Sequence, residues 1–117
     1  MAGNGLMNSF VLGSALAALL AGAPMTASAQ SGIASVYSGG HTASGERVTA
    51  ASLAAAHLTL PFGTMVRVTN RNTGRSVVVR IVDRGPFIRG RVIDVTPAAA
   101  RALGFSGLAR VSLAVLR

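Results

Sequence analysis

The sequence contains no cysteine and no tryptophan, and only three of its 117 residues are acidic. Without cysteine, the protein has no disulfide, no thiolate metal ligand and no site for a lipid on cysteine, so apolar packing and backbone pairing alone must stabilise it. Two histidines and three carboxylates are also a poor supply of metal ligands. We therefore predict no metal, no cofactor and no lipid anchor.

Charge and long apolar runs are both missing from the first 29 residues. The apolar stretch from Phe10 to Ala23 is shorter than the roughly 20 residues that a membrane-spanning helix needs. It leads to Ala27-Ser28-Ala29, a small-residue pattern typical of signal-peptide cleavage. We predict a signal peptide over 1–29 and one domain over 30–117, exported to the periplasm or cell wall, monomeric and without a permanent membrane anchor.

Lysine is absent as well, so all 11 basic residues are arginine and the net charge is +8. Such an excess indicates an anionic partner. Nucleic acid is disfavoured, because the protein is predicted to be exported, its arginines are scattered and its aromatic side chains are few. Cell-wall polymers and lipid headgroups are the remaining anions. The alternative is that the arginines only keep the domain soluble.

Segments of alternating or β-branched residues dominate the chain after residue 30. The hairpin of TMVRVTN and RSVVVRIVD around the turn formers NRNTG is the clearest of them. Arg80 interrupts the second strand and is expected to point to a rim. Further strands are predicted at GIASVYS, RVIDV and ARVSLAVL. The pattern is typical of a mostly-β fold, a small barrel of five or six strands.

Two short helices are predicted between these strands. The first follows from the alanine-rich run between Thr49 and His57, which a threonine precedes. The second follows from TPAAARALGF, where Thr96 is the cap, Pro97 the first helical residue and Gly104 the stop. Both are expected to connect strands of the barrel.

The three carboxylates are the obvious candidates for acid–base chemistry. Asp83 ends the valine-rich strand at a loop, where functional groups are frequent, although it also suits a turn that caps the backbone. Asp94 lies among apolar residues in VIDVT, which favours a buried, hydrogen-bonded structural role. Glu46 in SGE has the pattern of a solvated surface charge.

Basic residues surround Asp83. Arg84, Arg89 and Arg91 are suited to gripping substrate carboxylates, or they only coat the loop. A general acid must keep its proton near neutral pH, which an adjacent guanidinium opposes. If the strand geometry continues through residue 84, however, Asp83 and Arg84 point to opposite faces. His57, at the end of the first predicted helix, can simply complement the negative helix terminus.

Three segments carry a family resemblance: TASGE, AAHLTLPFGTMVRVTN and GRSVVVRIVDRGPFIRGRVIDVTPAAARALG. Over residues 32–116 they resemble the core of the rare lipoprotein A family, the septal-ring-type lytic transglycosylases. The resemblance implies a six-stranded double-psi β-barrel, a fold shared with expansins, with one or two short helices. It also implies cleavage of peptidoglycan glycan strands between N-acetylmuramic acid and N-acetylglucosamine, with a preference for strands stripped of peptides.

The resemblance assigns roles to six residues of this chain. Asp83 in DRGP and His57 in AAH take the places of the family's essential pair. Glu46 and Asp94 are supporting residues of the groove, and Tyr37 and Arg84 are expected to contact sugar. Asp83 would donate a proton to the glycosidic oxygen, while His57 would orient Asp83 or assist the proton transfer.

The sequence also departs from the family pattern. Its first strand reads SVYS where the family usually has Ser-Trp-Tyr, the next loop is short, and no lipobox cysteine is present. Two alternatives to an enzyme therefore stay open. One is an expansin-like module that binds wall polysaccharide without cutting it, and the other is a protein-interaction or inhibitor domain that uses its basic face.

Overall fold

A computed structural model describes residues 29–37 and 40–116 of the chain. Apart from Ala29, the predicted signal peptide lies outside these residues. No helix within the described part is long and apolar enough to cross a membrane. In chain order the elements are β1 (Ala29–Val36), β2 (Gly40–His41), β3 (Arg47–Val48), β4 (Ala54–Ala56), β5 (Met65–Asn70), β6 (Ser76–Asp83), β7 (Arg91–Val95), α2 (Pro97–Leu103) and β8 (Ala109–Val115).

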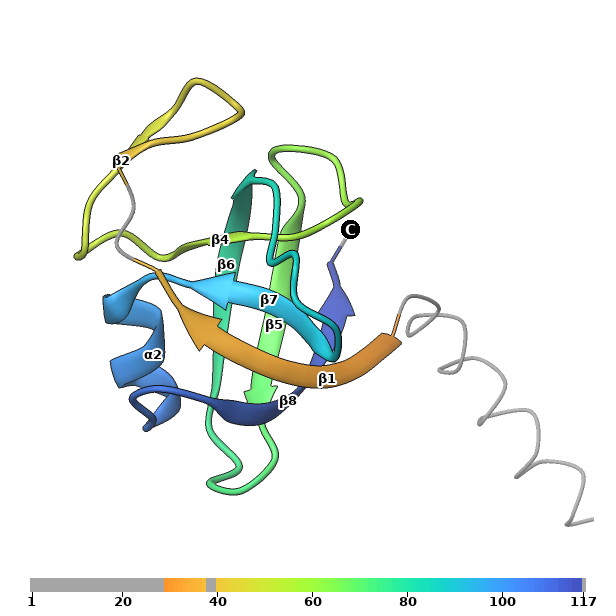
Figure 1. Ribbon diagram of the computed structural model, residues 1–117. Helices are drawn as coiled ribbons and strands as arrows, with labels where there is room; N and C mark the ends of the chain where they lie inside the picture. Colours follow the sequence, from red (N-terminus) through yellow and green to blue (C-terminus); the bar gives the residue numbers. More distant parts are fainter. Residues whose placement is uncertain (1–28, 38–39, 117) are drawn as a thin grey trace, which may run out of the picture.

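Six of these strands close into a barrel in the order β1-β7-β4-β6-β5-β8, and β2 pairs separately with β3 (Figure 1). The pairs β1–β7 and β4–β6 are parallel, whereas the other neighbours run antiparallel. The predicted hairpin is the β5–β6 pair, in which Val66 lies opposite Val79. The mostly-β prediction and the six-stranded double-psi barrel are therefore confirmed.

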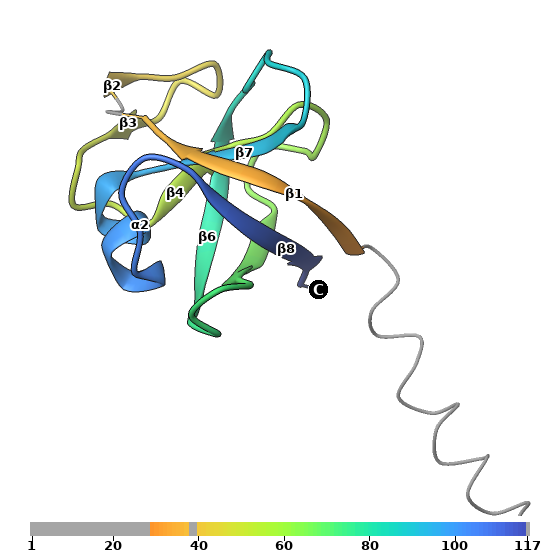
Figure 2. The ribbon, with the colours of Figure 1, turned by 60° about the horizontal axis from the view of Figure 1, so that its bottom comes forward.

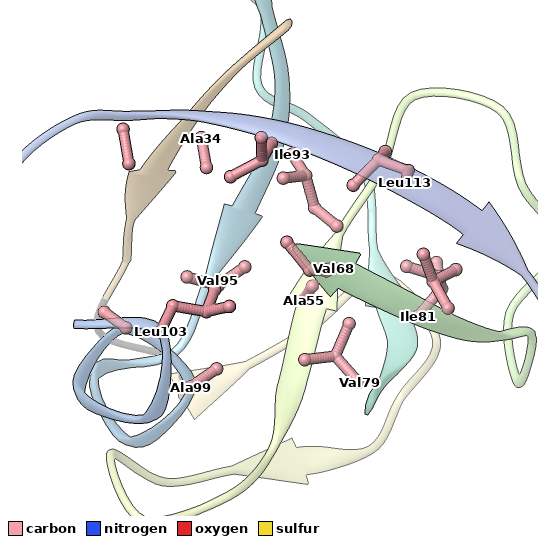
Figure 3. Close-up of a cluster of buried hydrophobic side chains, with 14 residues drawn as sticks. Ala34, Ala55, Val68, Val79, Ile81, Ile93, Val95, Ala99, Leu103 and Leu113 are labelled. Atoms are coloured by element: carbon pink, nitrogen blue, oxygen red, sulfur yellow. The ribbon is translucent and has the colours of Figure 1, made fainter. Parts of the chain in front are cut away.

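Alternate residues of the strands fill the inside of the barrel. Val66, Val68, Val79 and Ile81 are completely buried, as the two-residue period of a strand requires for one apolar face (Figure 3). Arg80, between two of them, is exposed as expected. The remaining buried members of this cluster come from β1, β4, β7, β8 and α2: Ala34, Ala55, Ile93, Val95, Ala99, Ala100, Leu103, Ala109, Val111 and Leu113.

The helix predicted between Thr49 and His57 is wrong. Ala54–Ala56 form β4, which lies between β6 and β7, and all three side chains are buried. Ala55 joins the main core, while Ala54 packs with Val48 and Val82 in a second cluster. Alanine has a high helix propensity, but that preference is weak and is overridden where a segment buries both faces between two strands.

The second predicted helix is confirmed as α2, with Pro97 in its first turn. Gly104 ends it with a φ of 83°, a conformation that glycine adopts without strain, and its amide donates to the carbonyls of Ala100 and Arg101. Thr96 has the extended backbone of a cap, but its hydroxyl makes no capping bond. It donates instead to the Ser52 carbonyl and so fixes the segment that leads into β4.

The loops divide between the two ends of the barrel. The β2–β3 hairpin and the β6–β7 connection lie at the end where β6 finishes, and the β5–β6 turn lies at the opposite end (Figures 1 and 2). Asp83 is the last residue of β6. The fold therefore places this carboxylate among loops rather than on a flat strand surface.

Candidate active site

Asp83 lies where the β6 strand leaves the barrel. The register of β6 against β4 shifts between Ile81 and Asp83, so the alternation of Val79 and Ile81 does not extend to this carboxylate. The Oδ1 atom accepts hydrogen bonds from the backbone amides of Ala43 and Arg84, each at 2.9 Å. The Ala43 bond holds the loop between β2 and β3 over the carboxylate, which is half-buried as a result.

The Arg84 side chain bonds away from the Asp83 carboxylate, although β6 ends at Asp83 and its strand geometry does not continue through residue 84. Its Nη1 atom donates to the carbonyls of His57 at 3.2 Å and Leu60 at 2.8 Å. The guanidinium carbon lies 4.1 Å from the centre of the Phe62 ring, in a cation–π contact. The one ion pair among the described residues joins Arg80 to Glu46. The Asp83 carboxylate thus has no guanidinium partner in this part of the chain.

Tyr37 and Asp94 complete the surroundings of Asp83. Burial, with the negative charges of Asp83 and Asp94 added, raises the pKa of Tyr37 to about 12, so the hydroxyl remains a donor at neutral pH. That hydroxyl is buried and has no hydrogen-bond partner among the described residues. Asp94 accepts a hydrogen bond from the Ser35 hydroxyl, and it is half-buried rather than buried. The charges of two carboxylates therefore act on one phenol.

Glu46 lies in the loop between β2 and β3, next to the start of β3. Its carboxylate pairs with Nε of Arg80 at 3.1 Å, and its backbone carbonyl accepts from the Thr42 hydroxyl at 2.6 Å. Both partners of the ion pair are nearly half exposed, so the pair contributes little to the free energy of unfolding. Its effect is local, because it fixes the loop that donates the Ala43 amide to Asp83.

His57 contacts Asp83 through its backbone amide and not through its ring. The His57 amide donates to the Asp83 carbonyl at 3.1 Å, whereas the ring bonds to Gln30 and to the amides of Thr59 and Leu60. Burial first, and the charge of Arg84 second, lower the pKa of His57. Asp83 and Asp94 thus lie near enough for their charges to act on the Tyr37 phenol, whereas the His57 ring bonds to Gln30, Thr59 and Leu60.

The remaining predicted residues add no contact to this group. Arg89 is exposed in the β6–β7 connection, and Arg91 begins β7. Within the described chain no group of three or more histidine, aspartate or glutamate side chains is arranged to hold a metal ion.

Several partners in the site were not found from the sequence. The Ser35 hydroxyl, the Ala43 amide and the Phe62 ring each contact a predicted residue that is distant in sequence. Ser35 is 59 residues from Asp94, and Ala43 is 40 residues from Asp83. No local pattern reports such a contact, because the closure of the barrel brings the partners together.

Comparisons with known proteins agree on the family. A family model described as "Lytic transglycolase" matches residues 29–113. The chain is 58% identical over 93 residues to the "Probable endolytic peptidoglycan transglycosylase RlpA" of Nostoc sp., covering 73% of this chain and 25% of that protein. It is 49% identical over 90 residues to the "Endolytic peptidoglycan transglycosylase RlpA" of Neisseria meningitidis, covering 72% and 38%. The chain thus spans well under half the length of these relatives.

Solved structures support the same barrel. The Streptomyces papain inhibitor superposes with a TM-score of 0.63 at 24% identity, over 77% of this chain and 96% of that one. The apo form of a Clavibacter michiganensis expansin gives a TM-score of 0.64 at 24% identity, over 77% and 51%. At this identity the likeness describes the fold alone. Taken with the matched family model and the RlpA relatives, it leads to one conclusion: the chain belongs to the lytic transglycolase family.

Proposed function

We propose that this chain is an endolytic peptidoglycan transglycosylase domain, which cuts glycan strands between N-acetylmuramic acid and N-acetylglucosamine and leaves 1,6-anhydromuramic ends. The observation that carries the proposal is the position of Asp83, a carboxylate at the end of the barrel with no guanidinium paired to it among the described residues. Family membership and the names of the RlpA relatives support the same reaction.

In this reaction Asp83 acts first as an acid and then as a base. Its carboxyl proton passes to the glycosidic oxygen as the bond to C1 of the muramic acid breaks and an oxocarbenium-like centre forms. The C6 hydroxyl of the same sugar then closes on C1, and its proton returns to the Asp83 carboxylate. No water is consumed, so a second carboxylate to activate water is unnecessary. This economy suits a domain with only three acidic residues.

The neighbours of Asp83 would bind the sugar around the bond that breaks. The Tyr37 hydroxyl is covered in the free protein, so it would donate to a sugar oxygen only when substrate binding uncovers it, and no hydrogen bond to the described chain would be lost in that change. Asp94, held by Ser35, is an acceptor for sugar hydroxyls on the same side. Glu46 supports the groove indirectly by fixing the loop above Asp83.

The arginines suit a substrate rich in carboxylates. Glycan strands without stem peptides expose the lactyl carboxylate of each muramic acid, and guanidinium groups bind carboxylates with paired hydrogen bonds. Arg84 uses only Nη1 in its bonds to the described residues, so its other donors are available to such a group. We therefore propose peptide-poor strands as substrate and the periplasm or cell wall as the place of action, with the domain working as a monomer.

The test is mass spectrometry of the products that residues 30–117 release from purified sacculi stripped of peptides by an amidase. Asp83→Asn is expected to abolish 1,6-anhydromuramic products without unfolding the domain. Glu46→Gln removes one negative charge as well but keeps the acid, so it should only reduce the yield. If Asp83→Asn releases the same products as the wild type, Asp83 does not donate the proton.

One observation favours a second function, the expansin-like binding of wall polysaccharide without cleavage. Val36 stands in SVYS where the family usually has an aromatic residue, and it is 37% exposed. Without an aromatic side chain at this position, the domain lacks a stacking contact with the sugar ring on which cleavage would depend. Binding of the domain to sacculi with no soluble muropeptide released would support this second function over the first.

A further inference from the structure

Both ring nitrogens of His57 are already occupied. Nδ1 lies 3.1 Å from the backbone amides of Thr59 and of Leu60, and Nε2 lies 2.9 Å from Oε1 of Gln30. An amide N–H can only donate, so Nδ1 carries no proton and the single proton of a neutral ring is on Nε2, which donates to Gln30. The side chain is only 5% exposed. A ring bonded in this way has no free position from which to exchange a proton with a substrate.

The bonds to Nδ1 determine the shape of the segment from residue 57 to residue 62. The amides of Thr59 and Leu60 turn inward to the ring, and the carbonyls of His57 and Leu60 accept the two hydrogen bonds from Arg84. Phe62, at the end of the same segment, lies against the guanidinium. One side of this turn thus binds the imidazole and the other holds the arginine.

We propose that His57 is a positioning residue, whose Nδ1 folds this turn into the shape that holds Arg84 beside the active site. The inference rests on the proposed function, in which Asp83 is the acid and Arg84 binds the substrate. The same segment is joined to Asp83 by the hydrogen bond from the His57 amide to the Asp83 carbonyl. His57 therefore acts on the reaction through the backbone turn and the guanidinium, and its ring does not carry a proton.

Three substitutions separate the two ring nitrogens. In His57→Asn the side-chain oxygen lies near the place of Nδ1 and can still accept from Thr59 and Leu60. In His57→Gln the amide nitrogen lies near the place of Nε2 and can still donate to Gln30, but the acceptor for the turn is lost. His57→Ala loses both. His41→Asn, in the exposed strand β2, is the matched control.

We expect His57→Asn to keep most of the wild-type kcat/KM. His57→Gln and His57→Ala should lower kcat/KM by about 10- to 100-fold, because the Arg84 guanidinium loses the hydrogen bonds that position it. The amides of Thr59 and Leu60 should stay protected from hydrogen exchange in His57→Asn and become exposed in the other two. If His57→Asn is as inactive as His57→Ala while those amides remain protected, the ring itself is needed and the proposal is wrong.

A second measurement does not depend on activity. Nitrogen NMR of the wild-type protein should show His57 protonated on Nε2 and unprotonated on Nδ1. The exchange of the Arg84 side-chain N–H protons with water should be slow in the wild type and in His57→Asn only. A proton on Nδ1 would overturn the proposal. If the wild type releases no anhydro products, the proposed function fails, and the NMR result still decides whether His57 holds the turn and Arg84.

Discussion

Replacing Tyr37 with phenylalanine should change stability and activity in opposite directions. The Tyr37 hydroxyl is buried near Asp83 and Asp94 and has no hydrogen-bond partner among the described residues. Its desolvation is therefore not compensated in the folded protein, whereas in the unfolded chain water satisfies it. Phenylalanine keeps the ring and removes only this group. The variant should be more stable than the wild type and a poorer catalyst.

The size of both effects follows from the burial. An unsatisfied buried polar group costs about 1–3 kcal/mol, so the free energy of unfolding should rise by about that amount. For a domain of 60–100 residues each kcal/mol shifts the unfolding midpoint by about 4–8 °C, which gives an increase of about 4–24 °C. The loss of one neutral hydrogen bond to substrate, about 0.5–1.5 kcal/mol, should lower kcat/KM by about 2- to 10-fold.

Thermal unfolding followed by circular dichroism and product release from stripped sacculi are the two assays. Thr96→Val is the matched control, because its hydroxyl is equally buried but donates to the Ser52 carbonyl, and its loss should lower the midpoint. If Tyr37→Phe lowers the midpoint as Thr96→Val does, the phenol has a partner in the folded protein. If kcat/KM is unchanged, Tyr37 does not contact the substrate.

Three further predictions concern the barrel and its histidine. Asn70→Ala should cost about 2–4 kcal/mol in chemical unfolding, because the buried side chain bonds to the Leu103 carbonyl and to turn amides, whereas Asn72→Ala on the exposed turn should stay within about 0.5 kcal/mol. Gly32→Ala should cost about 1–3 kcal/mol, since a Cβ there would lie 2.4 Å from a methyl carbon of a neighbouring valine; an unchanged midpoint would mean that the valine moves freely. The pKa of His57 is lowered in the folded state from its ordinary value of 6.5. As the pH falls below 6.5, the unfolded chain therefore binds a proton before the folded protein does. Stability present above that pH should be lost below it, by up to about 1.4 kcal/mol per pH unit, and His57→Asn should remove this slope in urea titrations at different pH.

The strands with regular patterns could be predicted from the sequence by itself. The β5–β6 hairpin, β7, β8 and α2 each carry a period or a pair of caps that belongs to one element, so local physical chemistry decides them. The family motifs likewise pointed to Asp83 and to the barrel. The scarcity of acidic residues was also informative, because it left few side chains that could perform acid–base chemistry.

Only the tertiary structure decided the rest, because the deciding contacts join distant parts of the chain. Ala54–Ala56 became a strand when β6 and β7 buried both of its faces, against the helix preference of alanine. The ring of His57 bonds to Gln30, 27 residues away, so its distance from the Asp83 carboxylate could not be read from the motif. The sequence thus determined which residues are chemically able to act, and closure of the barrel determined which of them face one another.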